Sequence, residues 1–103
     1  MSSSVYEIVV YQVTNRESAI TARRKAMEAT KSYPGFRAYR PLNGLEPLNL
    51  MADLIEWDDY ESAKAAGEKV KSDPAFAEIF AQISDFKLLA HFTSGKLLSS
   101  VDA

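Results

Sequence analysis

The segments of this chain that read as β-strands are apolar on both faces, although the sequence offers only two helices to cover them. These segments are Val5–Val13 (VYEIVVYQV), Leu50–Trp57 (LMADLIEW) and Phe86–Thr93 (FKLLAHFT). A strand with one face in water alternates apolar and polar residues, and these strands largely do not. Two helices can pack against one face of a small sheet. The sequence therefore predicts a homodimer, in which a second copy of the sheet covers the other face.

Length and composition predict a single domain, residues 1–103, with residues 99–103 as a frayed tail. The net charge of −2 leaves no basic excess for binding nucleic acid through its phosphates. The absence of cysteine excludes a disulfide framework, a thiolate nucleophile and a cysteine metal site. The N-terminus lacks the basic region of a signal peptide, and no apolar run approaches the ~20 residues that span a bilayer. We expect a cytoplasmic protein without a membrane partner.

The order of elements predicts a ferredoxin-like fold. Thr14 or Asn15 caps a first helix that runs to about Ser32, and Asp58 or Asp59 caps a second. The strands are expected at Val5–Val13, Phe36–Arg40, Leu50–Trp57 and Phe86–Thr93, and the last strand is expected to resume at Lys96–Leu98. A turn is expected at Pro41–Gly44. A helical segment is expected to start again after Ser72-Asp73-Pro74, with Phe76, Ile79, Phe80 and Ile83 at helical spacing. This β-α-β-β-α-β order places two helices on one face of a four-stranded antiparallel sheet, which is an α+β architecture.

Three short motifs carry a resemblance to a known family. They are Pro34-Gly35-Phe36, the run Leu54–Ala63 (LIEWDDYESA), and Ser72–Phe76 (SDPAF) followed by Phe80. Together they resemble the antibiotic biosynthesis monooxygenase-like family of the dimeric α+β barrel superfamily. The resemblance implies a homodimer whose two sheets pack face to face, with a pocket between sheet and helices in each subunit. Known members include cofactor-independent oxygenases of polycyclic phenols, haem-degrading oxygenases and proteins without assigned activity.

The chain departs from that family at two places on its helices. Many members have a histidine on the helix after the tryptophan strand, and here that stretch is Ala65-Ala66-Gly67. The segment that carries a ligand histidine and a tryptophan in haem-degrading members is here Ala77–Gln82 (AEIFAQ). We therefore expect no cofactor and no metal.

His91, the sole histidine, is the candidate catalytic base because histidine is the side chain that most often accepts and donates protons near neutral pH. The alternative is a half-buried strand histidine bonded to a neighbour. Asp53, in mid-strand on the face of Met51, Ile55 and Trp57, is the second catalytic candidate. Its alternative is a hydrogen bond or salt bridge at the subunit interface. Glu7 is a similar case on the first strand.

Aromatic strand residues are the candidates for binding a planar ligand. Trp57, Tyr11 and Tyr39 can form a slot for it, although the same residues also suit plain core packing. Arg37, which alternation puts on the face of Tyr39, can bind an anionic or phenolate group; its alternative is an exposed strand end. The run Arg23-Arg24-Lys25 is predicted to be a solvated helix face.

Two functions follow from these residues. The first is a cofactor-independent oxygenase of a small aromatic or quinone-type substrate, with His91 as base and Asp53 or an arginine orienting it. The second is a non-catalytic dimeric barrel that binds a small apolar ligand or acts in a stress response. An open cavity between sheet and helices that reaches His91 favours the first.

Overall fold

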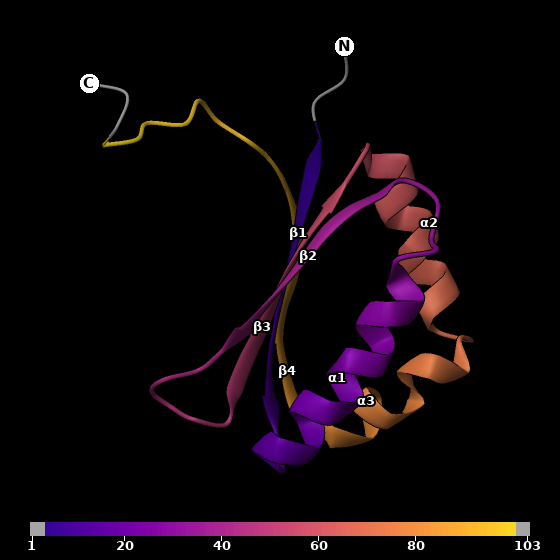
Figure 1. Ribbon diagram of the computed structural model, residues 1–103, viewed down its shortest axis with the longest axis vertical. Coiled ribbons are helices and arrows are strands. Elements are labelled where there is room, and N and C mark those ends of the chain that lie inside the picture. Colours follow the sequence, from indigo (N-terminus) through magenta and orange to yellow (C-terminus); the bar gives the residue numbers. More distant parts are fainter. Residues whose placement is uncertain (1–3, 101–103) are drawn as a thin grey trace.

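The computed structural model describes residues 4–100 and contains one sheet and a layer of helices (Figure 1). The elements in chain order are β1 (Val5–Val13), α1 (Arg16–Thr30), β2 (Phe36–Asn43), β3 (Leu50–Trp57), α2 (Tyr60–Val70), the 3-10 turn η1 (Pro74–Phe76), α3 (Ala77–Gln82) and β4 (Ile83–Thr93). The predicted α+β class and element order are confirmed.

The four strands form an antiparallel sheet in the order β2-β3-β1-β4. The register brings Val9 of β1 opposite Asp53 of β3 and Leu89 of β4. Because successive side chains point to opposite faces, one face carries the odd-numbered residues of β1 and β3. This face includes Glu7, Val9, Tyr11, Asp53, Ile55 and Trp57.

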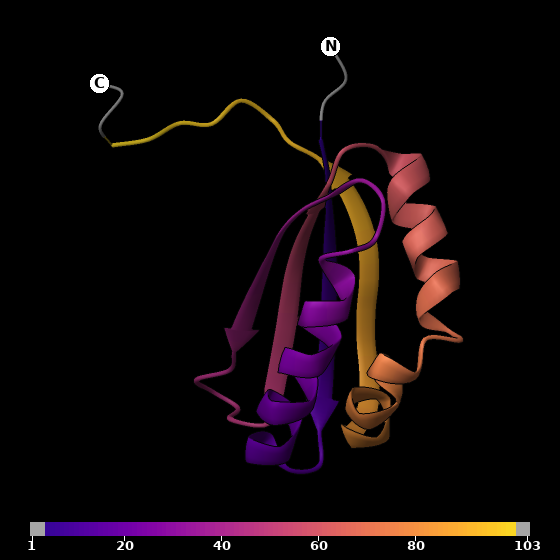
Figure 2. The same cartoon turned by 45° about the vertical axis from the view of Figure 1, so that its right-hand side comes forward.

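The helices cover this one face and leave the other face without a layer (Figures 1 and 2). Large residues come from the sheet, where Tyr11, Met51 and Trp57 are almost completely buried. Small residues come from the helices, which lets them lie close to the sheet: Ala19, Ala22 and Ala26 on α1, and Ala63 and Ala66 on α2. The core is thus built between one sheet face and two alanine-rich helix faces.

The local signals for helix ends and turns act as the sequence predicts. The side chains of Asn15, Asp59 and Asp73 each cap a helical segment by accepting a hydrogen bond from a backbone N–H. Gly35 has a φ of 82° in the turn before β2, a conformation that only glycine adopts easily. Its Cα also lies against Ser62, because a Cβ added at Gly35 would be 2.2 Å from the Ser62 Oγ.

Two strand boundaries differ from the prediction. β2 continues through the expected turn to Asn43, since it is an edge strand paired with β3 alone and so tolerates Pro41. β4 begins at Ile83, where helical spacing predicted the end of the last helix, because Ile83 pairs with Val13 of β1. Lys96–Leu98 forms no strand. Of the predicted tail, residues 101–103 lie outside the described residues.

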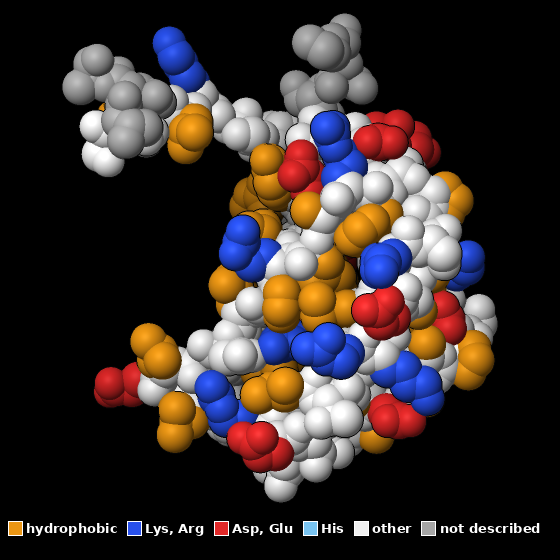
Figure 3. Space-filling model, viewed as in Figure 1, with side chains coloured by type: hydrophobic (Ala, Val, Ile, Leu, Met, Phe, Trp, Pro, Cys, Tyr) orange, Lys and Arg blue, Asp and Glu red, His pale blue; other side chains and the backbone are white. Residues whose placement is uncertain are grey.

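The uncovered sheet face is apolar, and two segments project beyond it. Figure 1 shows the β2–β3 loop and the segment after β4 leaving the body on the side away from the helices. Figure 3 shows hydrophobic side chains along the body between these two projections. Leu42, Leu88 and Phe92 are half-exposed on this side, and Leu45, Leu48, Leu97 and Leu98 of the projections are exposed. Among residues 4–100, no helix is long and apolar enough to cross a membrane.

Candidate functional site

A cavity of about 250 Å³ lies between the sheet and the helices. Its floor is formed by the odd-numbered face of β1 and β3 together with Tyr39 of β2. Residues of α1, α2, η1 and α3 form the opposite wall, among them Ala26, Ala66, Phe76 and Ile79. Phe80, Phe86 and Leu89 line the cavity while remaining about half-exposed, so they mark its mouth beside β4. The lining is mainly apolar, with few polar groups, which is the usual make-up of a small-molecule site.

A buried ion pair stands at the floor of the cavity. Asp53 is 6% exposed and Arg23 is 3% exposed, and their Oδ1 and Nη1 atoms lie 3.5 Å apart. Tyr11 donates a hydrogen bond of 3.0 Å to the other carboxylate oxygen of Asp53. Arg23 also donates to the backbone oxygen of Leu42 and to the side-chain oxygen of Asn43. One charge pair therefore joins α1 to β1, β2 and β3.

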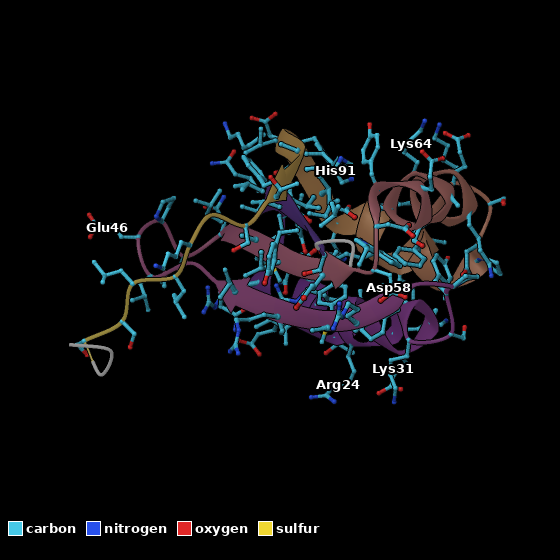
Figure 4. All side chains as sticks on the ribbon, turned by 90° about the horizontal axis from the view of Figure 1, so that it is seen from above. Arg24, Lys31, Glu46, Asp58, Lys64 and His91 are labelled. Atoms are coloured by element: carbon cyan, nitrogen blue, oxygen red, sulfur yellow. The ribbon has the colours of Figure 1, made fainter. Side chains whose placement is uncertain are left out.

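The exposed position predicted for Arg23 is wrong, and the reason is helical geometry. Arg23 lies four residues after Ala19 and three before Ala26, so it belongs to the alanine face that packs on the sheet. Arg24, one position on, is exposed and points away from the body (Figure 4). The signal that could have found Arg23 is Asp53 itself, because a carboxylate in an apolar mid-strand position needs a buried cation.

Burial dominates the protonation of the groups at this floor. It raises the pKa of Asp53, and the contacts with Tyr39, Arg23 and Tyr11 offset part of this effect. Burial also raises the pKa of Tyr11 and of Tyr39, and the nearby Asp53 carboxylate raises both further. Both phenols stay protonated at neutral pH and act as hydrogen-bond donors. Asp53 already has Arg23 and Tyr11 as partners, and its Oδ1 atom is fully buried without a hydrogen bond.

A second polar group lies on the same floor: Glu7, which the sequence marks as a case similar to Asp53 but which is not among the six predicted site residues. Glu7 lines the cavity, and its Oε1 atom accepts a 2.9 Å hydrogen bond from the Trp57 indole nitrogen. The Nε2 atom of His91 lies 3.8 Å from the same oxygen. Burial raises the pKa of Glu7, while the hydrogen bond from Trp57 and the proximity of His91 lower it in part. Register explains the grouping, since Glu7 lies opposite Ile55 on one side and His91 on the other.

His91 itself is not among the residues that line the cavity. It lies on β4 beside the start of α2 (Figure 4), where its ring meets the Tyr60 ring edge-on at 5.5 Å between centroids. Glu7 therefore stands between the histidine and the cavity. Trp57, Tyr11, Tyr39 and Asp53 all line the cavity, so the structure brings four of the six predicted site residues together around it.

Arg37 does not reach this cavity. The register of β2 against β3 shifts between Phe36 and Ala38, which breaks the alternation that would have put Arg37 beside Tyr39. Arg37 is half-exposed, and its Nε atom lies 3.8 Å from Glu56 and 3.7 Å from Asp58. The expected position on the face of Tyr39 is therefore wrong, and Arg37 stands at the strand end. Within residues 4–100 no three His, Cys, Asp or Glu side chains gather as metal ligands.

The fold places the chain in a well-defined structural class. It is similar to SnoaB, a cofactor-independent oxygenase from Streptomyces nogalater, with a TM-score of 0.73 and 17% identity over 94% of this chain and 98% of that one. The chain is also similar to a Bordetella bronchiseptica protein that is provisionally named an antibiotic biosynthesis monooxygenase. The TM-score is 0.75 and the identity is 10%, over 94% of this chain and 100% of that one. A Chloroflexus aurantiacus protein with the same provisional name has a TM-score of 0.68 and 18% identity, over 94% and 98%.

The resemblance predicted from the sequence is thus confirmed at the level of the fold. No family model matches the sequence, and no curated protein sequence is significantly similar to it. At such low identity, similar structures establish the architecture and leave the chemistry to the residues of the site.

Replacement of Arg23 by methionine is expected to lower the free energy of unfolding by about 3–5 kcal/mol, because it leaves the Asp53 carboxylate buried without its partner. Urea denaturation measures the change. Arg24→Met on the exposed face is the matched control and should change stability by less than about 0.5 kcal/mol. Equal effects of the two substitutions would show that the Arg23–Asp53 pair contributes nothing.

Replacement of Glu7 by glutamine should make the protein more stable at neutral pH. The pKa of the Glu7 carboxyl group is raised in the folded state, so the folded protein binds the proton of this group more tightly than the unfolded chain does. Proton binding therefore favours the folded state in acid, and this contribution is lost as pH rises above 4.5. The stability advantage of Glu7→Gln should therefore be smallest in acid and grow as pH rises. Urea denaturation from acid to neutral pH measures it. Asp59→Asn is the control of opposite sign, because hydrogen bonds from Ser62 lower the pKa of Asp59.

Proposed function

We propose that the chain is an antibiotic biosynthesis monooxygenase-like protein that binds a small aromatic or quinone-type substrate between its sheet and its helices and oxygenates it without a cofactor. The observation that carries this proposal is the apolar cavity, whose floor contains the aromatic residues Trp57, Tyr11 and Tyr39 and two carboxylates. The similarity in fold to a cofactor-independent oxygenase supports the reaction class.

The volume of the cavity limits the size of the ligand. An engineered apolar cavity of about 150 Å³ in another protein holds one benzene molecule. The present cavity of about 250 Å³ therefore suits one or two fused rings better than the larger polycyclic phenols. The mouth formed by Phe80, Phe86 and Leu89 leaves room for a substituent to extend toward solvent.

The residues of the site suit chemistry that the substrate performs largely by itself. A ring that loses a proton becomes electron-rich enough to pass an electron to dioxygen. For an activated ring CH₂ group, dioxygen supplies the new carbonyl oxygen and leaves its second atom as water, with all electrons coming from the substrate. The protein's part is to exclude water, orient the ring and accept the proton.

A second candidate function is binding without turnover. It is favoured by the position of His91, the predicted base, outside the residues that line the cavity. In this candidate the chain is a dimeric barrel that binds a small apolar ligand in the same cavity or acts in a stress response. Oxygen uptake in the presence of a bound one- or two-ring phenol distinguishes the two candidates.

Filling the cavity should abolish ligand binding. Val9 is half-buried and lines the cavity, so Val9→Phe places a ring where the ligand would lie. Titration with 2-naphthol should quench the fluorescence of Trp57, the sole tryptophan, in the native protein and fail to do so in Val9→Phe. The control Ala65→Phe adds the same ring at an exposed position of α2 and should bind normally. Undiminished binding by Val9→Phe would place the ligand elsewhere.

The homodimer belongs to the same proposal, and the uncovered sheet face supports it. Side chains at even-numbered positions of β1 and β3 and those paired with them on β4, such as Val10, Ala52 and Leu88, make this face apolar. Exposed apolar surface of this extent usually marks an interface. A second copy of the sheet offers a matching apolar face. The exposed leucines of the β2–β3 loop and of residues 94–100 project beyond this face, so they can pack against the edges of the second sheet (Figures 1 and 3).

Adjacent residues of β4 test the dimer. Leu88 is 45% exposed on the uncovered face, and Leu89 is 49% exposed at the cavity mouth on the opposite face. Light scattering should give twice 11.4 kDa for the native protein and for Leu89→Arg. Leu88→Arg should give the monomer mass, because it would bury an unpaired charge between the two sheets. A native monomer, or a dimer unaffected by Leu88→Arg, would contradict the proposed interface.

A further inference from the structure

Glu7 presents an unpaired carboxylate oxygen at the floor of the cavity. Its Oε1 atom is held by the Trp57 indole and faced by His91, as the distances of 2.9 and 3.8 Å show. Residues 4–100 supply no hydrogen-bond donor for Oε2. Among the described residues, Asp53 Oδ1 is the only fully buried side-chain oxygen or nitrogen that lacks a hydrogen bond. Oε2 of Glu7 also lacks one, so it is not fully buried and keeps accessible surface. A cavity ligand can reach it.

The two carboxylates of the cavity differ in what they can still bind. Asp53 has Arg23 at 3.5 Å and the Tyr11 hydroxyl at 3.0 Å, so its charge is balanced within the protein. Glu7 is faced by His91 from β4 and Trp57 from β3, with Asp53 further along the floor and Lys71 at the end of α2 on the cavity wall. Since Trp57 fixes one oxygen, the other oxygen is oriented before a ligand arrives.

We propose that Glu7, rather than His91 or Asp53, binds the ring hydroxyl of the ligand and takes up its proton. In this step the hydroxyl O–H bond breaks and a new O–H bond forms at Oε2 of Glu7. The electron pair stays on the ring oxygen, which becomes the phenolate. His91 lies 3.8 Å from the other oxygen of Glu7 and takes no part in this step. The inference rests on the proposed function, because it requires an aromatic ligand in the cavity.

The acidity of the ligand decides how far the proton moves. An ordinary phenol has a pKa of about 10, so it would donate a hydrogen bond to a carboxylate and keep its proton. Burial raises the pKa of Glu7 above 4.5, which reduces the difference between the pKa of the phenol and that of the carboxyl group. Complete transfer therefore needs a ring hydroxyl that is more acidic than a plain phenol, such as that of a hydroxyquinone. This is the ligand class that we infer for the cavity. 4-Nitrophenol has this acidity but an electron-poor ring, so it serves as a probe of the proton transfer and not of the oxygenation.

Two ring compounds of nearly equal shape test the assignment. 4-Nitrophenol carries the hydroxyl, and 4-nitroanisole replaces it with a methoxy group that cannot donate. Calorimetric titration is made at a pH below the pKa of free 4-nitrophenol. The native protein should bind 4-nitrophenol at least about tenfold more tightly than 4-nitroanisole. The visible absorption band of the nitrophenolate should appear on binding, because Glu7 takes the proton.

Variants at Glu7 separate the hydrogen bond from the proton transfer. Glu7→Gln retains an acceptor oxygen, so it should keep part of the preference for 4-nitrophenol and lose the nitrophenolate band. Glu7→Leu should lose both. His91→Phe, which keeps a ring against Tyr60, should retain the preference and the band. Circular dichroism melting of each variant shows that the fold is intact.

The outcomes separate the two proposals. If neither compound binds the native protein, the proposed function fails. If both bind with equal affinity, or if Glu7→Gln keeps the nitrophenolate band, the cavity is a ligand site and the role of Glu7 is overturned. Loss of the preference and the band in His91→Phe alone would assign the proton to the histidine instead.

Discussion

The buried pair of Arg23 and Asp53 is the interaction on which the remaining structure depends. Two opposite charges are almost excluded from water here, and their Nη1 and Oδ1 atoms lie 3.5 Å apart. Through Tyr11, Leu42 and Asn43, the pair connects the first helix to three of the four strands. Such a pair contributes little net stability over apolar residues of the same size, but its loss is costly. It therefore defines where α1 sits on the sheet more than how strongly it is held.

The position of α1 in turn keeps the cavity open. The helices contribute small buried alanines to the core, while the sheet contributes the larger side chains of Tyr11, Trp57 and Asp53. Small residues such as Ala26 and Ala66 then leave space above the aromatic floor rather than filling it. The resulting site divides its polar groups between one carboxylate balanced by the protein and one that retains an unpaired oxygen. Glu7 can therefore bind a ligand through its free oxygen, whereas Asp53 already has its partners within the protein.

Much of the fold follows from local sequence signals. Asn15, Asp59 and Asp73 cap helical segments, and Gly35 takes the left-handed conformation in its turn. These signals act over a few residues, so they can be read without the tertiary structure. Pro41 lies in β2 and not in the predicted turn, because an edge position permits a proline. Ile83 begins β4 and does not end the last helix, because its pairing with Val13 outweighs the helical spacing. The site residues Asp53 and Trp57 follow from the sequence, because alternation along β3 puts them on one face with Met51 and Ile55, and this face is buried.

The sequence by itself determined the element order, the two apolar faces of the sheet and the choice of face for Asp53 and Trp57, because alternation along a strand is a local property. Only the tertiary structure decided which groups meet across elements. Helix packing turned Arg23 inward to Asp53, strand register put Glu7 between Trp57 and His91, and a register shift moved Arg37 away from Tyr39. Each of these depends on pairing between residues far apart in the chain, for which a single sequence carries no direct record.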